Sequence, residues 1–300
     1  MTLHAIVAAF GGDLYQGGRR ANVPAPGHSA HDRSVSLLLS EGRVVIHGFG
    51  AADWREMRDL LRSSGFIDDA GRLTGAGQAG ASPPRPNRQI RSETARRLWD
   101  GGVALASGDP ASRHLRRRAV VGGHNASGLR FHPSAPISVY REGSRSRPAL
   151  VAQVSDADDA LTAVEITYLE ANGLVAAGLT LSRKTVGIVP PGAAVRLSPS
   201  AAEMLVGEGV MTTLSAIERF QLPGWALMSA NNLAVWVPPP EVQRLLIAAD
   251  SGAVGQGAAD RLRRRLVRTG INVRILWPDP PLGDWNEVAC AVRKRGERGR

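Results

Sequence analysis

The chain has 300 residues, 43% of them hydrophobic, which is enough to build a core in one large or two ordinary domains. No apolar run approaches the roughly 18 residues of a membrane span. The first residues lack the basic-then-apolar order of a signal peptide, so we expect a cytoplasmic protein that does not enter a membrane. The single cysteine, Cys290, excludes an intramolecular disulfide and any site built from several thiolates.

Positive charge is concentrated in the first half of the chain. The net charge is +10, and only Lys184 and Lys294 are lysines, so almost all of it is arginine. Residues 1–150 carry 21 arginines against 12 acidic residues, whereas residues 151–292 carry 11 basic and 14 acidic residues. This asymmetry favours a protein that handles a polyanion with one part and does chemistry with another. A solvated arginine-rich surface is the alternative.

The first 90 residues predict a small separate module. Alternating apolar residues on both sides of Glu41-Gly42 predict a β-hairpin, and residues 54–65 predict an amphipathic helix. The Gly-, Ala- and Pro-rich stretch at 76–90 predicts a linker, which is the clearest domain boundary in the chain.

The middle of the chain changes from helical to strand patterns. Helices are predicted near residues 92–99 and 108–118, and strands at 129–133, 149–154 and 162–169. A basic strand, Arg183-Lys184-Thr185, follows them.

Two apolar runs in the last third each end on a carboxylate. Glu208 follows the run at 204–207, and Asp250 follows the run at 245–249. Continuously apolar strands are typical of parallel sheets, whose carboxyl ends bind ligands. Two parallel strands would bring both carboxylates to one edge, and carboxylate oxygens are ligands that Mg²⁺ prefers. The alternative is that each carboxylate caps the next helix or pairs with an arginine.

Three short motifs in order resemble the Toprim domain of primases, topoisomerases and some nucleases. They are Glu208-Gly209, then Asp250-x-Gly252-x-x-Gly255, then Asp284-Trp285-Asn286. The nearest resemblance is to primase-like Toprim proteins of plasmids and prophages. It implies an α/β fold with a mostly parallel, helix-flanked Toprim sheet. A mixed α+β segment similar to the primase core would precede this sheet, after a small N-terminal β-hairpin module.

The resemblance also implies roles for individual residues. Glu208 would ligate Mg²⁺ or act as the general base, Asp250 would ligate the ion, and Asp284 would ligate or anchor it, with Mn²⁺ as the alternative cation. Nucleotide phosphates would lie near Gly209, Ser251 and Gly255, whose loop precedes a helix. Lys184 would contact a phosphate, with a plain surface lysine as the alternative.

The sequence departs from the family pattern at two places. Gly252 stands where the family has a second aspartate, so one negative charge of the magnesium cluster is missing. The N-terminal module resembles the zinc-binding module of primases, but Ala25 stands at the first cysteine. His28, His31 and His47 without a thiolate are a poor zinc set, so we expect a metal-free remnant rather than a zinc site.

These features predict five segments and one preferred function. The segments are a degenerate zinc-finger-like module at 1–75, a linker at 76–90, a primase-core-like segment at 91–195, a Toprim domain at 196–290, and a disordered basic tail at 291–300. The preferred function is Mg²⁺-dependent synthesis of RNA primers on single-stranded DNA by a primase-like nucleotidyltransferase, in DNA replication or mobilisation. The expected partners are single-stranded DNA, nucleoside triphosphates and a replicative helicase.

The sequence is also compatible with two other functions. A noncatalytic DNA-binding accessory of replication and a Toprim nuclease are the alternatives. A topoisomerase is disfavoured, because only Tyr15, Tyr140 and Tyr168 are present and the chain has no room for gate domains.

Overall fold

The computed structural model describes residues 2–26, 28, 32–49, 53–74, 86–140, 143–179 and 181–298. The chain divides into two compact units, Met1–Arg85 and Pro86–Arg300, which are described separately. Residues 76–85 of the expected linker lie outside the described residues. Within the described ranges, no helix has both the length and the apolar composition needed to cross a membrane.

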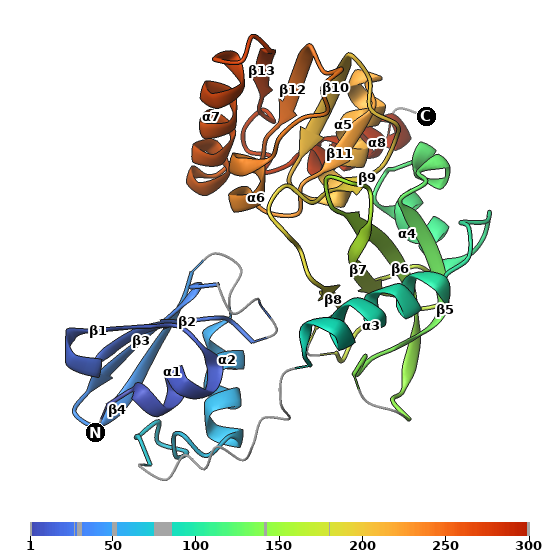
Figure 1. Cartoon of the computed structure of the whole chain (residues 1–300). Helices are drawn as coiled ribbons and strands as arrows, with labels where there is room; N and C mark the ends of the chain where they lie inside the picture. The colour runs from blue at the N-terminus through green and yellow to red at the C-terminus, as the bar shows by residue number, and fades with distance from the viewer. Residues whose placement is uncertain are drawn as a thin grey trace. The chain divides into compact units, whose positions relative to one another are not determined.

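The first unit is a four-stranded antiparallel sheet with two helices (Figure 1). Its elements are α1 (His4–Phe10), β1 (Asp13–Tyr15), the 3-10 turn Gln16–Gly18, β2 (Arg20–Val23), β3 (Val35–Ser40), β4 (Arg43–Gly48) and α2 (Trp54–Ser63). The predicted hairpin is β3–β4, and its turn residues Glu41 and Gly42 both have positive φ, as a two-residue hairpin turn requires. Strands β1 and β2 were not predicted, because three or four residues are too few to show alternation.

The second unit begins with an antiparallel sheet in the order β5-β6-β7-β8. Its elements are α3 (Arg88–Asp100), α4 (Pro110–Arg117), the 3-10 turn Gly122–Asn125, β5 (Leu129–Pro136), β6 (Ser146–Ser155), β7 (Leu161–Tyr168) and β8 (Arg183–Gly187). Both helices begin at capping side chains, since Asn87 accepts from the Ile90 N–H and Asp109 from the Ser112 N–H. The α3 helix packs its Leu98 against one face of this sheet.

The rest of the second unit is the predicted mostly parallel sheet, in the order β13-β12-β10-β11-β9. Its elements are β9 (Val195–Arg196), β10 (Glu203–Gly207), α5 (Val210–Phe220), β11 (Gly224–Ala226), α6 (Ala230–Val235), β12 (Arg244–Ala248), α7 (Ala253–Val267), β13 (Asn272–Leu276) and α8 (Trp285–Arg298). All pairs are parallel except β9–β11. The predicted α/β fold class is therefore confirmed.

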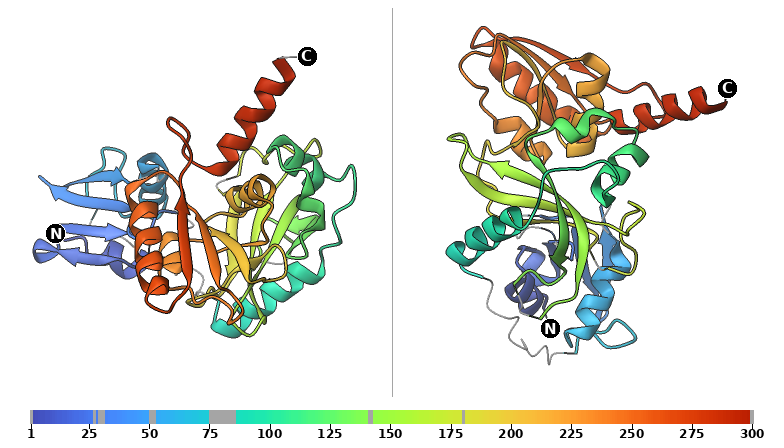
Figure 2. Two further views of the ribbon diagram at one scale, coloured as in Figure 1. Left: turned by 90° about the horizontal axis from the view of Figure 1, so that it is seen from above. Right: turned by 90° about the vertical axis from the view of Figure 1, so that its right-hand side faces the viewer.

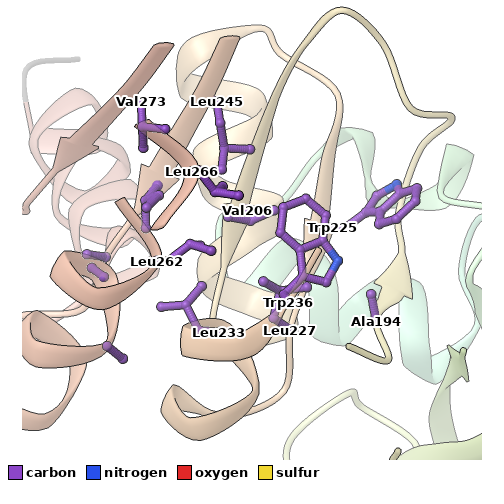
Figure 3. Packing of buried hydrophobic residues seen from close by; sticks show 14 of the residues in the cluster. Ala194, Val206, Trp225, Leu227, Leu233, Trp236, Leu245, Leu262, Leu266 and Val273 are labelled. Atoms are coloured by element: carbon purple, nitrogen blue, oxygen red, sulfur yellow. The ribbon is translucent and has the colours of Figure 1, made fainter. Parts of the chain in front are cut away.

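Helices cover both faces of the parallel sheet, which is why its strands are continuously apolar. Leu233 of α6 and Leu262 of α7 pack with Val206 and Trp236 on one face (Figure 3). Ala216 of α5 and Trp285 of α8 pack on the other face (Figure 2 shows the arrangement from two further sides). The sheet is thereby held rigid from both sides, and its strand ends keep fixed positions.

The prediction that the basic tail is disordered is wrong for residues 291–298, because these residues continue α8. The side chain of Asp284 caps the start of this helix, and Trp285 anchors it in the core. Near its end, both terminal nitrogens of Arg293 donate to the carbonyl oxygens of Arg116 and Arg117 in α4. Arg293 thereby satisfies carbonyls at the end of another helix and ties this part of α8 to α4.

Candidate active site

The two strand-end carboxylates of the parallel sheet lie at the same edge. Strands β10 and β12 are parallel neighbours, with Gly207 opposite Ala248. Glu208 is the next residue after β10, and Asp250 is the second residue after β12. The structure therefore places both side chains at the carboxyl ends of adjacent strands, which is where open α/β sheets bind ligands.

Asp250 lies in an electrostatically unfavourable place. Burial, the charge of Glu208 and the charge of Asp284 together raise the pKa of its carboxyl group to about 7. Its Oδ1 atom is buried and has no hydrogen-bond partner within the described part of the chain. A carboxylate that is buried beside two others, with a free oxygen, is stabilised most by a cation.

Glu208 is held by the start of α6. Burial raises the pKa of its carboxyl group, and a hydrogen bond from the backbone N–H of Ala230 opposes this shift. Its carbonyl oxygen accepts from the N–H of Met228 at 2.8 Å. The Ala230 N–H is a contact that the sequence could not reveal, because the partner is a main-chain group from another segment.

Asp284 is the N-cap of α8. Its Oδ1 accepts from the Glu287 N–H at 2.7 Å, and Glu287 Oε2 accepts from the Gly283 N–H at 2.7 Å. This exchange is similar to a capping box. Asp284 thus has a structural role, and its charge also acts on Asp250.

The loops predicted to contact nucleotide phosphates differ in their free backbone N–H groups and in the space around their glycines. The Ser251 N–H is already used, since it donates to the Gly283 carbonyl at 2.7 Å. A Cβ atom on Gly255 would lie 3.1 Å from the Asp250 carbonyl oxygen, so a side chain there would press on the loop that carries Asp250. Gly209 precedes α5 without a side-chain cap, and its nearest contact for a Cβ atom would be at 3.9 Å. Gly252 has an extended φ of 175° and open space around it.

Lys184 is engaged within its own sheet. Its Nζ donates to the Ile137 carbonyl at 2.5 Å and lies 5.1 Å from the centre of the Tyr168 ring. Burial lowers the pKa of this amine to about 8. To contact a phosphate, as the sequence analysis expects, Lys184 would first have to leave the Ile137 carbonyl.

The donor set suits magnesium by chemistry. Among the described residues, no three histidine, cysteine or carboxylate side chains are close enough to hold one ion by themselves. Magnesium does not need three, because it keeps several waters and is usually held by one or two carboxylates plus substrate phosphates. Glu208 and Asp250, with the unpartnered Oδ1 of Asp250, provide such a pair.

Of the three histidines considered as zinc ligands, His28 and His47 have other contacts, and His31 lies outside the described residues. His28 Nδ1 lies 2.9 Å from Asp32 Oδ2, and Asp32 also accepts from the Ala25 N–H at 3.0 Å. His47 is an exposed residue of β4, and its ring centre lies 4.8 Å from that of Phe49. Ala25 is buried among the apolar side chains in the core of the first unit.

Asn286 is a positioning residue that the sequence analysis quoted only as part of a motif. It is fully buried, and its Nδ2 donates to the Arg118 carbonyl at 2.6 Å and to Ser215 Oγ at 2.9 Å. It therefore ties α8, and with it the Asp284 loop, to α5 and to the end of α4.

We expect Asn286→Ala to lower the unfolding free energy of the second unit by about 2–3 kcal/mol, because it leaves the Arg118 carbonyl and the Ser215 hydroxyl without this donor. Urea unfolding followed by tryptophan fluorescence measures this loss. The exposed Asn231→Ala is the matched control and should change stability by less than about 0.5 kcal/mol. If Asn286→Ala and Asn231→Ala changed the unfolding free energy equally, Asn286 would not be a positioning residue.

Two family profiles match adjoining parts of the second unit. Residues 89–197 match a family described as a domain of unknown function, DUF7146, and residues 203–294 match the family described as Toprim domain. No curated protein matches the sequence.

Several solved primase structures are similar to the chain. The primase fragment of the bacteriophage T7 primase-helicase protein is 14% identical, covers 62% of this chain and 68% of its own, and has a TM-score of 0.39. The zinc-binding and RNA polymerase domains of the Aquifex aeolicus primase are 12% identical, with 99% and 82% coverage and a TM-score of 0.45. A DNA primase domain from Pseudomonas aeruginosa is 15% identical, with 72% and 78% coverage and a TM-score of 0.42.

The profile match covers all three motifs on which the Toprim resemblance was based, together with strands β10 to β13. The resemblance is thereby confirmed at the level of the domain. The chain contains a Toprim domain, at residues 203–294.

Proposed function

We propose that the protein is a primase-like nucleotidyltransferase that joins ribonucleotides on a single-stranded DNA template with Mg²⁺, in replication or mobilisation of DNA. The observation that carries the proposal is that Glu208 and Asp250 follow the carboxyl ends of the adjacent parallel strands β10 and β12. Burial and the charges of Glu208 and Asp284 also raise the pKa of Asp250. A site that concentrates negative charge in this way is suited to a cation bound against a polyphosphate.

In this proposal Glu208 and Asp250 hold the ion, and Asp284 supports the site from its cap position. When bound, Mg²⁺ would polarise the α-phosphate of the incoming nucleotide and neutralise charge on the leaving pyrophosphate. Glu208 is either a ligand or the base that takes the proton of the attacking 3′-hydroxyl. Its raised pKa favours the second role, because a base with a pKa nearer neutrality accepts a proton more readily.

Binding of the template and the nucleotide is assigned to the basic parts of the chain. The 21 arginines of residues 1–150 supply phosphate contacts that carry no sequence information by themselves. The Gly209, Ser251 and Gly255 loops approach the nucleotide phosphates, and Lys184 contacts one of them after leaving Ile137. The expected division into a module at 1–75, a core segment at 91–195 and a Toprim domain at 196–290 is part of this proposal, as is a replicative helicase as partner.

Template-directed primer synthesis is the test. Purified protein, single-stranded DNA and labelled ribonucleotides should give short RNA products with Mg²⁺, and we expect Glu208→Gln to lower their rate at least about 100-fold. Glu203→Gln is the matched control, because Glu203 lies at the other end of the same strand and pairs with Arg244. It should keep the rate within about twofold. The enzymatic claim is lost if the intact protein makes no product over a range of Mg²⁺ and Mn²⁺ concentrations.

A second candidate is a noncatalytic DNA-binding accessory of replication. Gly252 favours it, because the second aspartate of the family motif is missing at an open, exposed position. This candidate predicts salt-sensitive binding to single-stranded DNA that is indifferent both to Mg²⁺ and to Glu208→Gln. Metal-dependent nicking of the DNA, instead of primer synthesis, would assign the site to a nuclease.

A further inference from the structure

A groove with a volume of about 660 Å³ runs along the free edge of the Toprim sheet. It is lined by five consecutive residues, Val273 to Trp277, and by Gln256, Asp260 and Arg263 of α7. Successive strand residues point to opposite faces, so a cavity lined by five in a row follows the edge of the strand rather than one face. Figure 1 shows β13 as the outermost strand, with α7 beside it.

The main chain of β13 presents hydrogen-bonding groups to this groove. The Asn272 N–H donates to the Gln243 carbonyl, and the Leu276 carbonyl accepts from the Ala249 N–H. In a parallel ladder these bonds are made by alternate residues, so the N–H and C=O groups of Val273 and Ile275 point away from β12. An unpaired edge of this kind is a template for another strand.

Two arginines flank the edge from opposite faces. Val273 and Ile275 pack toward α7, which carries Arg263, whereas Arg274 projects to the other face of the sheet. Both guanidinium groups are exposed, and neither has an ion pair with a described residue. An added strand with acidic side chains on both faces would pair with both arginines.

We propose that this groove binds an extended acidic segment of a partner protein, which adds to the sheet as a sixth strand beside β13. A peptide backbone offers donors and acceptors at strand spacing, so it satisfies both the N–H and the C=O groups of Val273 and Ile275. A DNA backbone offers acceptor oxygens only, and the 2′-hydroxyl donors of RNA do not recur at strand spacing, so neither would pair with these carbonyls in register. The charge and the backbone geometry together therefore favour a peptide. This binding is separate from the cation site and does not depend on the proposed function.

The test uses the full-length protein and a dye-labelled eight-residue peptide in which pairs of Glu alternate with pairs of Val, so that glutamates lie on both faces of the added strand. Binding is followed by fluorescence polarisation. We expect saturable binding that becomes at least about tenfold weaker in the double variant Arg263→Glu, Arg274→Glu. The matched control is Arg261→Glu, Arg264→Glu, which makes the same charge change on exposed α7 residues outside the groove. It should stay within about twofold of the unchanged protein.

Methylation of the peptide amides tests the backbone bonds without altering the protein. Two versions are compared, N-methylated at the odd or at the even residues, and one of them should lose binding while the other keeps it, since only alternate amides face β13. Binding equally affected by both arginine variants, or insensitive to both methylation patterns, would overturn the proposal. So would an oligonucleotide that binds through Arg263 and Arg274 where the peptide does not. Glu208→Gln should leave peptide binding unchanged, so failure here is distinguishable from failure of the proposed function.

Discussion

Replacing Asp250 by asparagine is expected to stabilise the metal-free protein by about 2 kcal/mol at pH 8, although it removes a proposed metal ligand. The wild-type carboxylate is buried beside two other carboxylates, and its pKa is raised to about 7. The full pKa shift would correspond to a destabilisation of about 4 kcal/mol. Solvent reaches part of the side chain and screens its charge, so the expected destabilisation is about half of this. Asparagine keeps the shape of the side chain and removes the charge.

The gain from Asp250→Asn should depend on pH in a defined direction. A carboxyl whose folded pKa lies above its unfolded pKa binds its proton more tightly in the folded state, so its cost is absent below about pH 4. The cost grows as the pH rises toward the folded value of about 7 and then levels off. The difference in stability between the variant and the wild type should therefore be large at pH 8 and small at pH 4.

Thermal unfolding measures this difference. We expect the melting temperature of Asp250→Asn to exceed that of the wild type by about 5 °C at pH 8 without divalent cations. Added Mg²⁺ should close the gap, because it stabilises only the protein that binds it. Asp260→Asn, at an exposed position of α7, is the control and should change neither value. A lower melting temperature for Asp250→Asn under these conditions would show that Asp250 is not held against electrostatic repulsion.

Restoring the missing charge is expected to strengthen cation binding. Gly252→Asp should lower the dissociation constant for Mn²⁺ about tenfold, which corresponds to about 1.4 kcal/mol. Position 252 accepts a side chain, because its φ is extended at 175° and no atom lies within 4 Å of a Cβ atom built there. The added carboxylate would stand two residues after Asp250, as in the family motif, and would add a unit of negative charge to the site.

The variant Gly252→Asn distinguishes the effect of the added charge on Mn²⁺ binding from the effect of the added side-chain volume. It has the same size as aspartate and no charge, so it should leave the Mn²⁺ dissociation constant unchanged. Isothermal titration calorimetry of the three proteins gives the comparison. If asparagine strengthens binding as much as aspartate does, the effect comes from ordering the loop; if neither does, the site lies too far from residue 252 for the missing aspartate to matter.

The parallel sheet was predictable because its physical signals are local. Apolar runs of four to six residues mark strands covered on both faces, and the carboxylates that end two of them must share an edge once the strands are parallel. Sequence order alone placed Glu208 and Asp250 after β10 and β12. The turn at Glu41-Gly42 was predictable for the same reason, since the preference for positive φ depends on these two residues alone.

The remaining features depend on contacts between distant segments. The Ala230 N–H on Glu208, and the Arg118 carbonyl and Ser215 hydroxyl on Asn286, come from partners that no local pattern indicates. The same holds for Arg293, whose bonds to α4 extend a helix through a run that composition alone marked as disordered. Lys184 is a further example, because its strand position was correct while its Ile137 partner was unforeseen.

Direct titration of Mn²⁺ into the full-length protein, followed by electron paramagnetic resonance, is the most direct test of the claim that Glu208 and Asp250 together hold a divalent cation. The account predicts a saturable site for which Mg²⁺ competes, weakened at least about tenfold by Glu208→Gln and by Asp250→Asn separately. Glu203→Gln should leave the site unchanged. Undiminished Mn²⁺ binding in either single variant would contradict the shared site and, with it, the proposed chemistry.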